Sequence, residues 1–557
     1  MRRRTIYHRR SVWIAALSGV TVGACVPVTA PKILGACTAS NAQPLSLAAR
    51  AYVTVDPAAN AGCIALPANA STVDSAEYLL VPWSASAVSG TSSPFVLLGG
   101  AGSLTASVTA NAIGPPSARG LSTAQAFDRF LRHAAATGVY GAPPAPAGPA
   151  AQRAPPLRAG PPSVGDTRTF KVCSNLACSQ FKSVVATAQT VGVHIAVYVD
   201  NLAPANGLNA ADLDTLTTLF DSRLYPIDTI AFGRESDVDQ NGVVIVLMTG
   251  AVNSLETAAQ CNASGYVSGF FYSADLAPTI RTQYNNGEVF YSIVADPDGM
   301  LSCTHSRTEV KQTVPGTFTH EFQHMMNYAQ HVLVRGGSPE QGWLDEGLSK
   351  YAEELAAVSY LPDDSAFSAG IIDDLYDAYQ YLEATGASPL LIPQDNGTLA
   401  EIGASWLFVR YLVDQFGDAL PRRLDQTALT GGANVTAATG QPYGTVVTRW
   451  ALANWVSGLP GFVPPPELTY SSWDFRTTFD TLSAQDSYDF PVPFPLVPPA
   501  GTGTGASLSG TLMAGSGMYY RALQAPGASG FTLLFRVNRT SALPATITPR
   551  LSLIRIR

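Results

Sequence analysis

The segment 319–326, THEFQHMM, constrains the fold more than any other feature of the chain. Because an α-helix turns once every 3.6 residues, His320 and His324 project from one face of a helix and Glu321 lies beside them. Apolar neighbours predict that this helix is buried on its other side, and Pro315-Gly316 is its expected start. Two histidines at this spacing can bind one zinc ion while the glutamate serves as general base. The alternative is an amphipathic helix with two structural histidines and a surface glutamate.

A third metal ligand has to come from elsewhere, since hydrolytic zinc sites usually take three protein ligands and one water. A nearby third histidine would require glycine at 327 and histidine at 330, where the chain has Asn327 and Gln330. The segment 342–349, GWLDEGLS, begins a second predicted helix with a carboxylate in its opening turns. Glu346 is the predicted third ligand and Asp345 its nearest rival. In the alternative interpretation Glu346 binds no metal, and its carboxylate is simply stabilised by the helix dipole near the N-terminus.

The two segments HEFQH and WLDEGL together resemble those of the gluzincin zinc metallopeptidases, and more narrowly the hyicolysin family of bacterial neutral zinc metallopeptidases. The resemblance extends over about residues 165–460. It implies that His320, His324 and Glu346 bind one zinc ion, that Glu321 is the general base, and that the substrate is a protein or peptide. Zinc would lower the pKa of a bound water to about 7 and polarise the scissile carbonyl.

The sequence motifs indicate the metal ligands and the general base, but they do not mark the group that would stabilise the oxyanion. Tyr411, in a helix predicted at 402–416, is a candidate, although a core aromatic is the favoured interpretation. This gap leaves open an alternative function, a catalytically inactive surface-binding lipoprotein that retains a metalloprotease fold. No segment resembling the amine-binding GxMEN motif of aminopeptidases occurs, which favours endopeptidase cleavage over N-terminal trimming. The strand expected at 269–272 is a candidate edge strand for substrate pairing.

A second, weaker metal motif lies at 237–242, DVDQNG. Asp237, Asp239 and Asn241 match the first half of an EF-hand loop and are candidate calcium ligands. Position twelve of that loop is Met248, where an EF-hand needs a bidentate glutamate. A tight turn before a β-branched run is therefore the simpler interpretation.

The N-terminus has the pattern of an export signal. Residues 1–24 combine a basic start with a short apolar run, and the small residues before Cys25 resemble a bacterial lipobox. This predicts lipidation at Cys25 and anchoring in the outer membrane or at the cell surface, with plain secretion as the alternative. The formal net charge of -8 excludes the electrostatic pattern of a nucleic-acid binder. The oligomeric state is left open.

Seven cysteines less Cys25 leave six, an even number that suits disulfides in an oxidising compartment. Their neighbourhoods predict three pairs: Cys37–Cys63, Cys173–Cys178 and Cys261–Cys303. Zinc binding by these thiols is the alternative, and their scattered spacing disfavours it.

At about 100–200 residues per domain, 557 residues predict three or four folded units. The expected fold is multidomain α+β, with a gluzincin-type zinc metalloprotease domain flanked by N-terminal and C-terminal β-sandwich domains. The predicted units are the signal 1–24, a β-sandwich 25–140 with a trailing helix at 123–136, a Pro/Ala-rich linker 141–164, the metallopeptidase domain 165–460 (β-rich 165–300, helical 301–460) and a β-sandwich 461–557. Strands in the last unit are expected at 472–475, 510–512, 519–523, 531–537 and 551–556.

Overall fold

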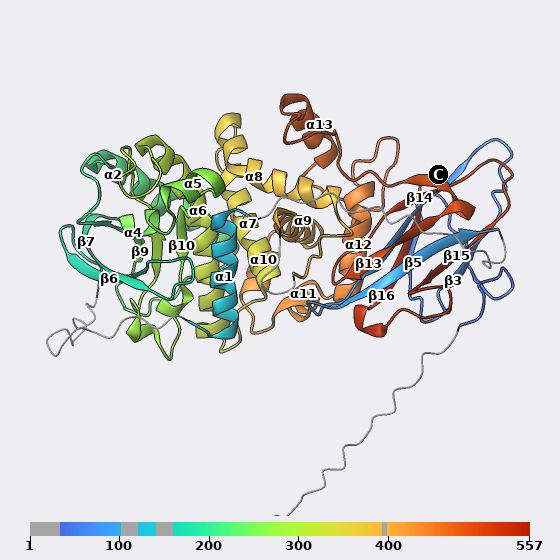
Figure 1. The fold of residues 1–557 in the computed structure, drawn as a ribbon, viewed down its shortest axis with the longest axis horizontal. Coiled ribbons are helices and arrows are strands. Elements are labelled where there is room, and N and C mark those ends of the chain that lie inside the picture. The colour runs from blue at the N-terminus through green and yellow to red at the C-terminus, as the bar shows by residue number, and fades with distance from the viewer. Residues whose placement is uncertain (1–33, 102–120, 141–159, 393–397) are drawn as a thin grey trace, which may run out of the picture.

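The computed structural model describes residues 34–101, 121–140, 160–392 and 398–557. The predicted signal, Cys25 and most of the predicted linker lie outside these residues. None of the helices in the described ranges is long and apolar enough to cross a membrane. The molecule is elongated, with a β-sandwich at one end, a six-stranded sheet at the other and helices between them (Figure 1). This is an α+β architecture.

The sandwich consists of two five-stranded sheets, in the orders β1-β3-β15-β5-β13 and β12-β14-β4-β16-β2. Apolar side chains of the two sheets, among them Leu80, Leu97, Leu533 and Leu553, form the core between them. The strands are β1 (Gln43–Pro44), β2 (Tyr52–Val55), β3 (Cys63–Leu66), β4 (Ala76–Ser84), β5 (Ser92–Gly100), β12 (Ala500–Thr502), β13 (Ser507–Met513), β14 (Tyr520–Gln524), β15 (Phe531–Arg536) and β16 (Pro549–Arg555).

Both ends of the chain build this one sandwich, so the prediction of two separate sandwiches is wrong. Strand β15 lies between β3 and β5, and β4 lies between β14 and β16. In the second sheet Leu553 of β16 is opposite Leu80 of β4. An alternating apolar pattern tells which face of a strand is buried but not which segment supplies its backbone partners, and each end alone has only half of the strands.

The strand expected at 472–475 is also absent from the described structure, because a helix, α13 (Phe475–Gln485), begins there. The side chain of Asp474 accepts a hydrogen bond from the backbone N–H of Thr477 and caps this helix. The aromatic residues that suggested a strand pack instead on one another, with the rings of Trp473 and Phe475 stacked at 5.5 Å.

The six-stranded sheet has the order β10-β11-β9-β8-β7-β6. Strands β11, β9 and β8 are parallel, and β10 pairs antiparallel with β11 at one edge of the sheet. The strands are β6 (Thr167–Cys173), β7 (Phe181–Val191), β8 (Ile195–Asp200), β9 (Val244–Met248), β10 (Gly269–Phe271) and β11 (Val289–Ser292). The position of β10 as an edge strand, expected from the sequence, is confirmed.

Helices connect and cover this sheet and then form the middle of the molecule. They are α2 (Ala210–Leu219), α3 (Tyr225–Ala231), α4 (Gly250–Asn253), α5 (Ala258–Ser264), α6 (Arg307–Tyr328), α7 (Gly342–Val358), α8 (Asp364–Glu383), α9 (Leu399–Phe416), α10 (Leu420–Asp425), α11 (Gly431–Thr439) and α12 (Tyr443–Val456). The sandwich meets this layer where Trp83 of β4 contacts Trp450 of α12, with ring centroids 6.0 Å apart.

Helix α6, which carries the histidine motif, starts earlier than the sequence predicted. Ser306 is its N-cap and forms a capping box with Glu309. Pro315 lies inside the helix, so the prediction that Pro315-Gly316 starts it is wrong. A proline in a helix removes one backbone donor, yet the buried side chains of Val314 and Phe318 on either side of it keep the helix packed in the core.

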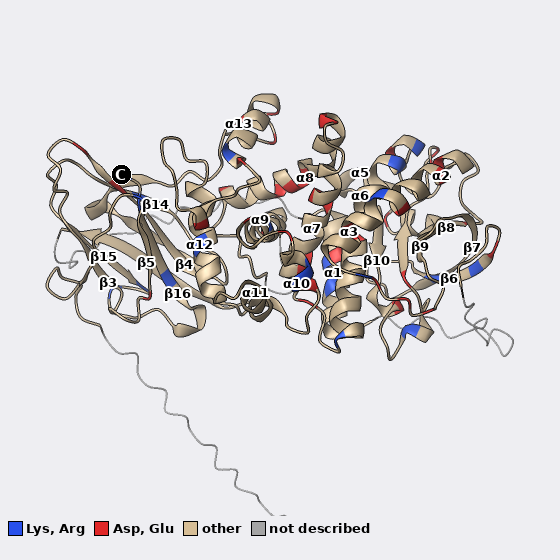
Figure 2. Ribbon diagram, turned by 180° about the vertical axis from the view of Figure 1, so that it is seen from behind, with Lys and Arg blue, Asp and Glu red and all other residues tan. Residues whose placement is uncertain are grey.

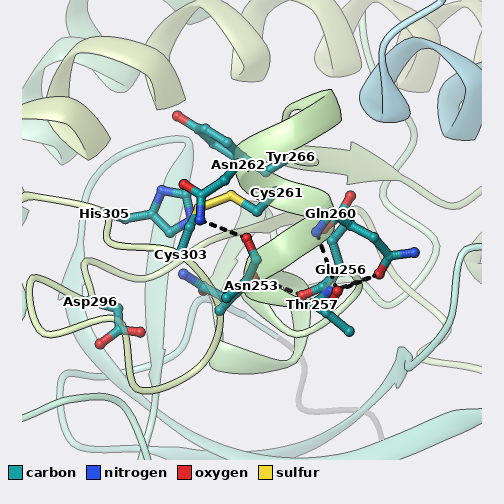
Figure 3. Close-up of a disulfide and its surroundings, with 12 residues drawn as sticks. Asn253, Glu256, Thr257, Gln260, Cys261, Asn262, Tyr266, Asp296, Cys303 and His305 are labelled. Carbon is teal, nitrogen blue, oxygen red and sulfur yellow. Dashed lines mark hydrogen bonds between the residues drawn. A yellow bond between two sulfur atoms is a disulfide. The ribbon is translucent and has the colours of Figure 1, made fainter.

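The three predicted disulfide pairs are confirmed. Cys37–Cys63 lies in the sandwich, and Cys173–Cys178 closes a short loop after β6. Cys261–Cys303 ties α5 to the segment that precedes α6, as Figure 3 shows. That segment is therefore anchored close to the start of the helix with the histidine motif.

Helix α1 (Thr123–Thr137) matches its predicted range but not its predicted place. It was expected to trail the N-terminal sandwich, and instead it packs beside β10, α6 and α7 (Figure 1). Ser122 and Gln125 form its capping box, and Gly138 ends it in the left-handed conformation. The ring of Phe127 contacts that of Phe270 in β10, with centroids 5.2 Å apart. The apolar face of α1 therefore belongs to the core around the histidine motif.

Candidate metal centre

Helices α6 and α7 pack together and bring His320, His324 and Glu346 to one point. The two Nε2 atoms of the histidines are 3.1 Å apart. Glu346 Oε2 lies 3.7 Å from Nε2 of His320, and Glu346 Oε1 lies 3.9 Å from Nε2 of His324. The three side chains are largely or fully buried. The structure thus juxtaposes the three residues that the sequence singled out.

A fourth group, which sequence reasoning missed, is Asp128 of α1. Its Oδ2 lies 3.9 Å from Nε2 of His320 and 3.8 Å from Nε2 of His324. One ligand atom from each of the four residues lies within 4.8 Å of every other. Asp128 is almost 200 residues from the motif and has no spacing signal of its own, so only the folded chain reveals it.

These four groups fit a zinc ion. Bonds of about 2.0–2.2 Å in a tetrahedron place neighbouring ligand atoms about 3.4 Å apart, and imidazole nitrogen and carboxylate oxygen are ligands that zinc prefers. The distances of 3.1 to 3.9 Å are close to that spacing. Glu346 Oε1 is buried and accepts no hydrogen bond from the described residues. A cation at this point would satisfy it.

The other ring nitrogen of each histidine faces a carboxylate from α7. His320 Nδ1 is 2.7 Å from Glu353 Oε1, and His324 Nδ1 is 3.1 Å from Asp345 Oδ1. The hydrogen bond with Glu353 fixes the ring orientation and the tautomer of His320, which leaves its Nε2 for a metal. The ring of His324 is instead hydrogen-bonded to the hydroxyl of Ser349, which is 3.1 Å from Nδ1 and 3.2 Å from Nε2. Asp345, the rival ligand, is therefore placed behind the histidine. Glu353 was not singled out from the sequence, although it follows Glu346 by seven residues on the same helix face.

Glu321 lies where α6 meets the edge strand β10. Its Oε2 accepts a hydrogen bond of 2.9 Å from the backbone N–H of Phe271 and lies 3.6 Å from Nη2 of Arg132. Burial and the negative charge of Asp128 raise the pKa of Glu321 to about 7. A carboxyl group with such a pKa can both accept and release a proton near neutral pH.

Burial also shapes the proposed ligands. Burial and then the charge of Asp128 raise the pKa of Glu346 well above its usual value. Burial lowers the pKa of His324, whereas, despite burial, the carboxylates of Asp128 and Glu353 raise the pKa of His320 well above its usual value. The buried carboxylates of Asp128 and Glu346 repel each other when both are charged, and a divalent cation between them would relieve that repulsion.

A cleft of about 1110 Å³ gives access to these groups and lies between α1, β10, α6, α7 and α8. Its charged lining includes Asp128, His320, Glu321, Glu346, Lys350 and Glu353. Figure 2 shows acidic and basic segments along α1, α7 and α8, whereas the sandwich has few. Tyr411 is not brought to this cleft: it is buried, and its hydroxyl donates to the carbonyl of Glu467 over 2.8 Å. It packs as a core aromatic.

The candidate calcium residues are held by protein groups. Asp239 pairs with Arg168 at 3.1 Å and accepts hydrogen bonds from Asn241. Asn241 Oδ1 in turn accepts from the backbone N–H of Val243, which closes the turn before β9. The carboxylate of Asp237 lies near those of Asp239 and Glu288. The structure gives no support for calcium and shows the tight turn that was the simpler interpretation.

The site is a buried histidine and carboxylate cluster beside a glutamate, the class of site found in metal-dependent hydrolases. The chain is 25% identical over 353 residues to the neutral metalloprotease ShpI of Staphylococcus hyicus. The aligned region covers 60% of this chain and 74% of that protein. This chain is thus a distant homologue of a metalloprotease. No family model matches the sequence.

A solved M1 zinc metallopeptidase of Deinococcus radiodurans, a variant bound to a Tyr-Ser-Ala substrate, is a weaker match. It has a TM-score of 0.25 and 15% identity, and the match covers 50% of this chain. This chain spans 55% of that protein.

Proposed function

We propose that the protein is an exported, zinc-dependent endopeptidase of the gluzincin type, with the hyicolysin family as its relatives. One observation carries the proposal: the Nε2 atoms of His320 and His324 converge with Glu346, while Nδ1 of His320 is hydrogen-bonded to Glu353 and Nδ1 of His324 to the hydroxyl of Ser349. The distant homology to a metalloprotease supports the same class.

In this proposal His320, His324 and Glu346 bind zinc and Glu321 is the general base. Zinc supplies a lowered water pKa and polarises the carbonyl of the peptide bond. The carboxylate of Glu321 accepts the proton of the attacking water and passes it to the leaving amine. Its hydrogen bond with Phe271 fixes its orientation.

The edge strand β10 is a further reason to propose a peptide substrate. Its outer edge faces the cleft, and an extended peptide can add to such an edge through backbone hydrogen bonds. Gly269 and Phe270 of β10 line the cleft together with His320 and Glu321. A substrate paired with β10 would therefore pass beside the proposed general base, which favours cleavage within a chain.

Three disulfides support export, because such bonds persist in oxidising compartments. Together with the lipobox-like segment they favour a lipoprotein attached through Cys25 to the outer membrane or the cell surface.

Metal analysis with two variants tests the proposal. We expect one zinc per purified chain, loss of zinc in Glu346→Ala, and retained zinc with peptide hydrolysis reduced by orders of magnitude in Glu321→Gln. Asp237→Asn, a carboxylate of the turn before β9, is the matched control and should keep both zinc and hydrolysis. Undiminished zinc in Glu346→Ala, or normal turnover by Glu321→Gln, would remove the proposal.

A further inference from the structure

Helix α1 presents buried charges to the proposed zinc site. Phe127 and Leu131 anchor it and are at most 2% exposed. From the same helix Asp128 lines the cleft and Arg132 reaches Glu321 and Phe271, and their side chains are 14% and 7% exposed. Charged residues are rarely this buried unless partners hold them. The partners of these two are the residues to which we assign the chemistry.

Asp128 is placed where it could be a fourth ligand of a zinc ion held by His320, His324 and Glu346. Its distances of 3.9 and 3.8 Å to the two Nε2 atoms equal those of Glu346 within 0.2 Å. A hydrolytic zinc site keeps this fourth position for water. A chain in which Asp128 fills it has no place for the attacking water.

Arg132 lies one turn further along α1 and contacts two more groups that the proposed hydrolysis needs, the general base and the edge of β10. Its Nη2 donates a 3.0 Å hydrogen bond to the carbonyl of Phe271 and lies 3.6 Å from Glu321 Oε2. The first contact covers the edge of β10, and the second pairs the proposed general base with a fixed positive charge. Arg132 Nε also lies 3.4 Å from Asp128 Oδ1, so the two side chains hold each other in place.

We propose that α1 is a built-in inhibitory segment of this enzyme, with Asp128 as the fourth zinc ligand of a latent form and Arg132 as the group that blocks Glu321 and β10. Hydrolysis then requires that α1 leaves the cleft. The proposal rests on the zinc site proposed above. In this latent form the carboxylate of Asp128 would take the place at the zinc ion that the carboxylate product of peptide hydrolysis would otherwise take.

The expected size of the effect follows from the population of the open site. If α1 is docked in about 99 of 100 molecules, a small ligand of the open zinc position binds about 100-fold more weakly than it would to a free site. Removing the Asp128 charge takes away one ligand of this docked state. We therefore expect Asp128→Asn to bind such a ligand at least about tenfold more tightly.

The test is calorimetric binding of acetohydroxamate to the zinc-loaded, full-length chain. Asp128→Asn should show the tenfold or larger gain, Arg132→Gln a gain in the same direction, and peptide hydrolysis should rise in both. His133→Gln, on the same helix but outside the cleft lining, is the matched control and should equal the unmodified chain. Phe127→Ala loosens the apolar anchor without removing any of the charged or metal-binding groups and should act in the same direction as Asp128→Asn.

The outcomes separate the two proposals. Equal acetohydroxamate affinity in the unmodified chain and Asp128→Asn, with one zinc in each, would overturn the inhibitory role and leave the zinc site intact. Slower hydrolysis by zinc-loaded Asp128→Asn would also overturn it, because Asp128 would then take part in turnover. An unmodified chain without zinc would instead contradict the proposed function.

Discussion

Glu353 offers a sharp test of how the site is held, because it touches a proposed ligand without being one. Its Oε1 lies 2.7 Å from His320 Nδ1 and 3.1 Å from the ammonium group of Lys350. Glu353→Gln keeps the size of the side chain but removes its charge. The imidazole of His320 then loses the partner that raises its basicity and fixes its ring.

Losing such a partner typically lowers metal affinity about 10- to 100-fold, which is about 1.4–2.8 kcal/mol. Burial places Glu353→Gln toward the larger value, since the side chains of His320 and Glu353 are only 13% and 18% exposed. Competition against a chromophoric chelator measures the zinc affinity, and Glu383→Gln on the neighbouring helix α8 is the control. An unchanged zinc affinity in Glu353→Gln would refute the orientation that we assign to His320.

Two further predictions concern stability. Replacing both Cys261 and Cys303 by serine opens a loop with a sequence separation of 42, and loop entropy predicts a loss of about 4 kcal/mol in urea unfolding; an unchanged midpoint would contradict it. A hydrogen bond from Lys311, with that from Arg307, holds the pKa of Asp212 at about 2. The unfolded value is about 3.9, so these contacts stabilise the chain above about pH 4 and the contribution is lost as pH falls toward 2. In Asp212→Asn the free energy of unfolding should fall less between about pH 4 and about pH 2 than in the unmodified chain. The same fall in both proteins would rule out a contribution from these contacts.

The parts of the site that the sequence revealed are those set by helix geometry. His320, Glu321 and His324 lie within one and a half turns of a single helix, so their spacing alone fixes their relation. Glu346 lies in the opening turns of a second recognisable helix, which begins at Gly342. Asp128 and Arg132 could not be found in this way, because they reach the site through the packing of α1, and their pattern on that helix is that of any amphipathic surface.

The sandwich shows the same limit at the level of the fold. Most of the C-terminal strands were predicted from the sequence. Their partners were not, because Leu80 and Leu553 become neighbours only through a pairing that spans most of the chain. A pattern with period two reports burial of a face, while the choice of partner depends on competition among all strand edges.

X-ray absorption at the zinc edge would identify the metal and its ligand atoms. For the full-length chain we expect one zinc with two imidazole nitrogens and only oxygen besides, at about 2.0–2.2 Å. In Glu346→Ala this signal should vanish. A chain without bound zinc, or a zinc ion with sulfur ligands at about 2.3 Å, would contradict the assignment.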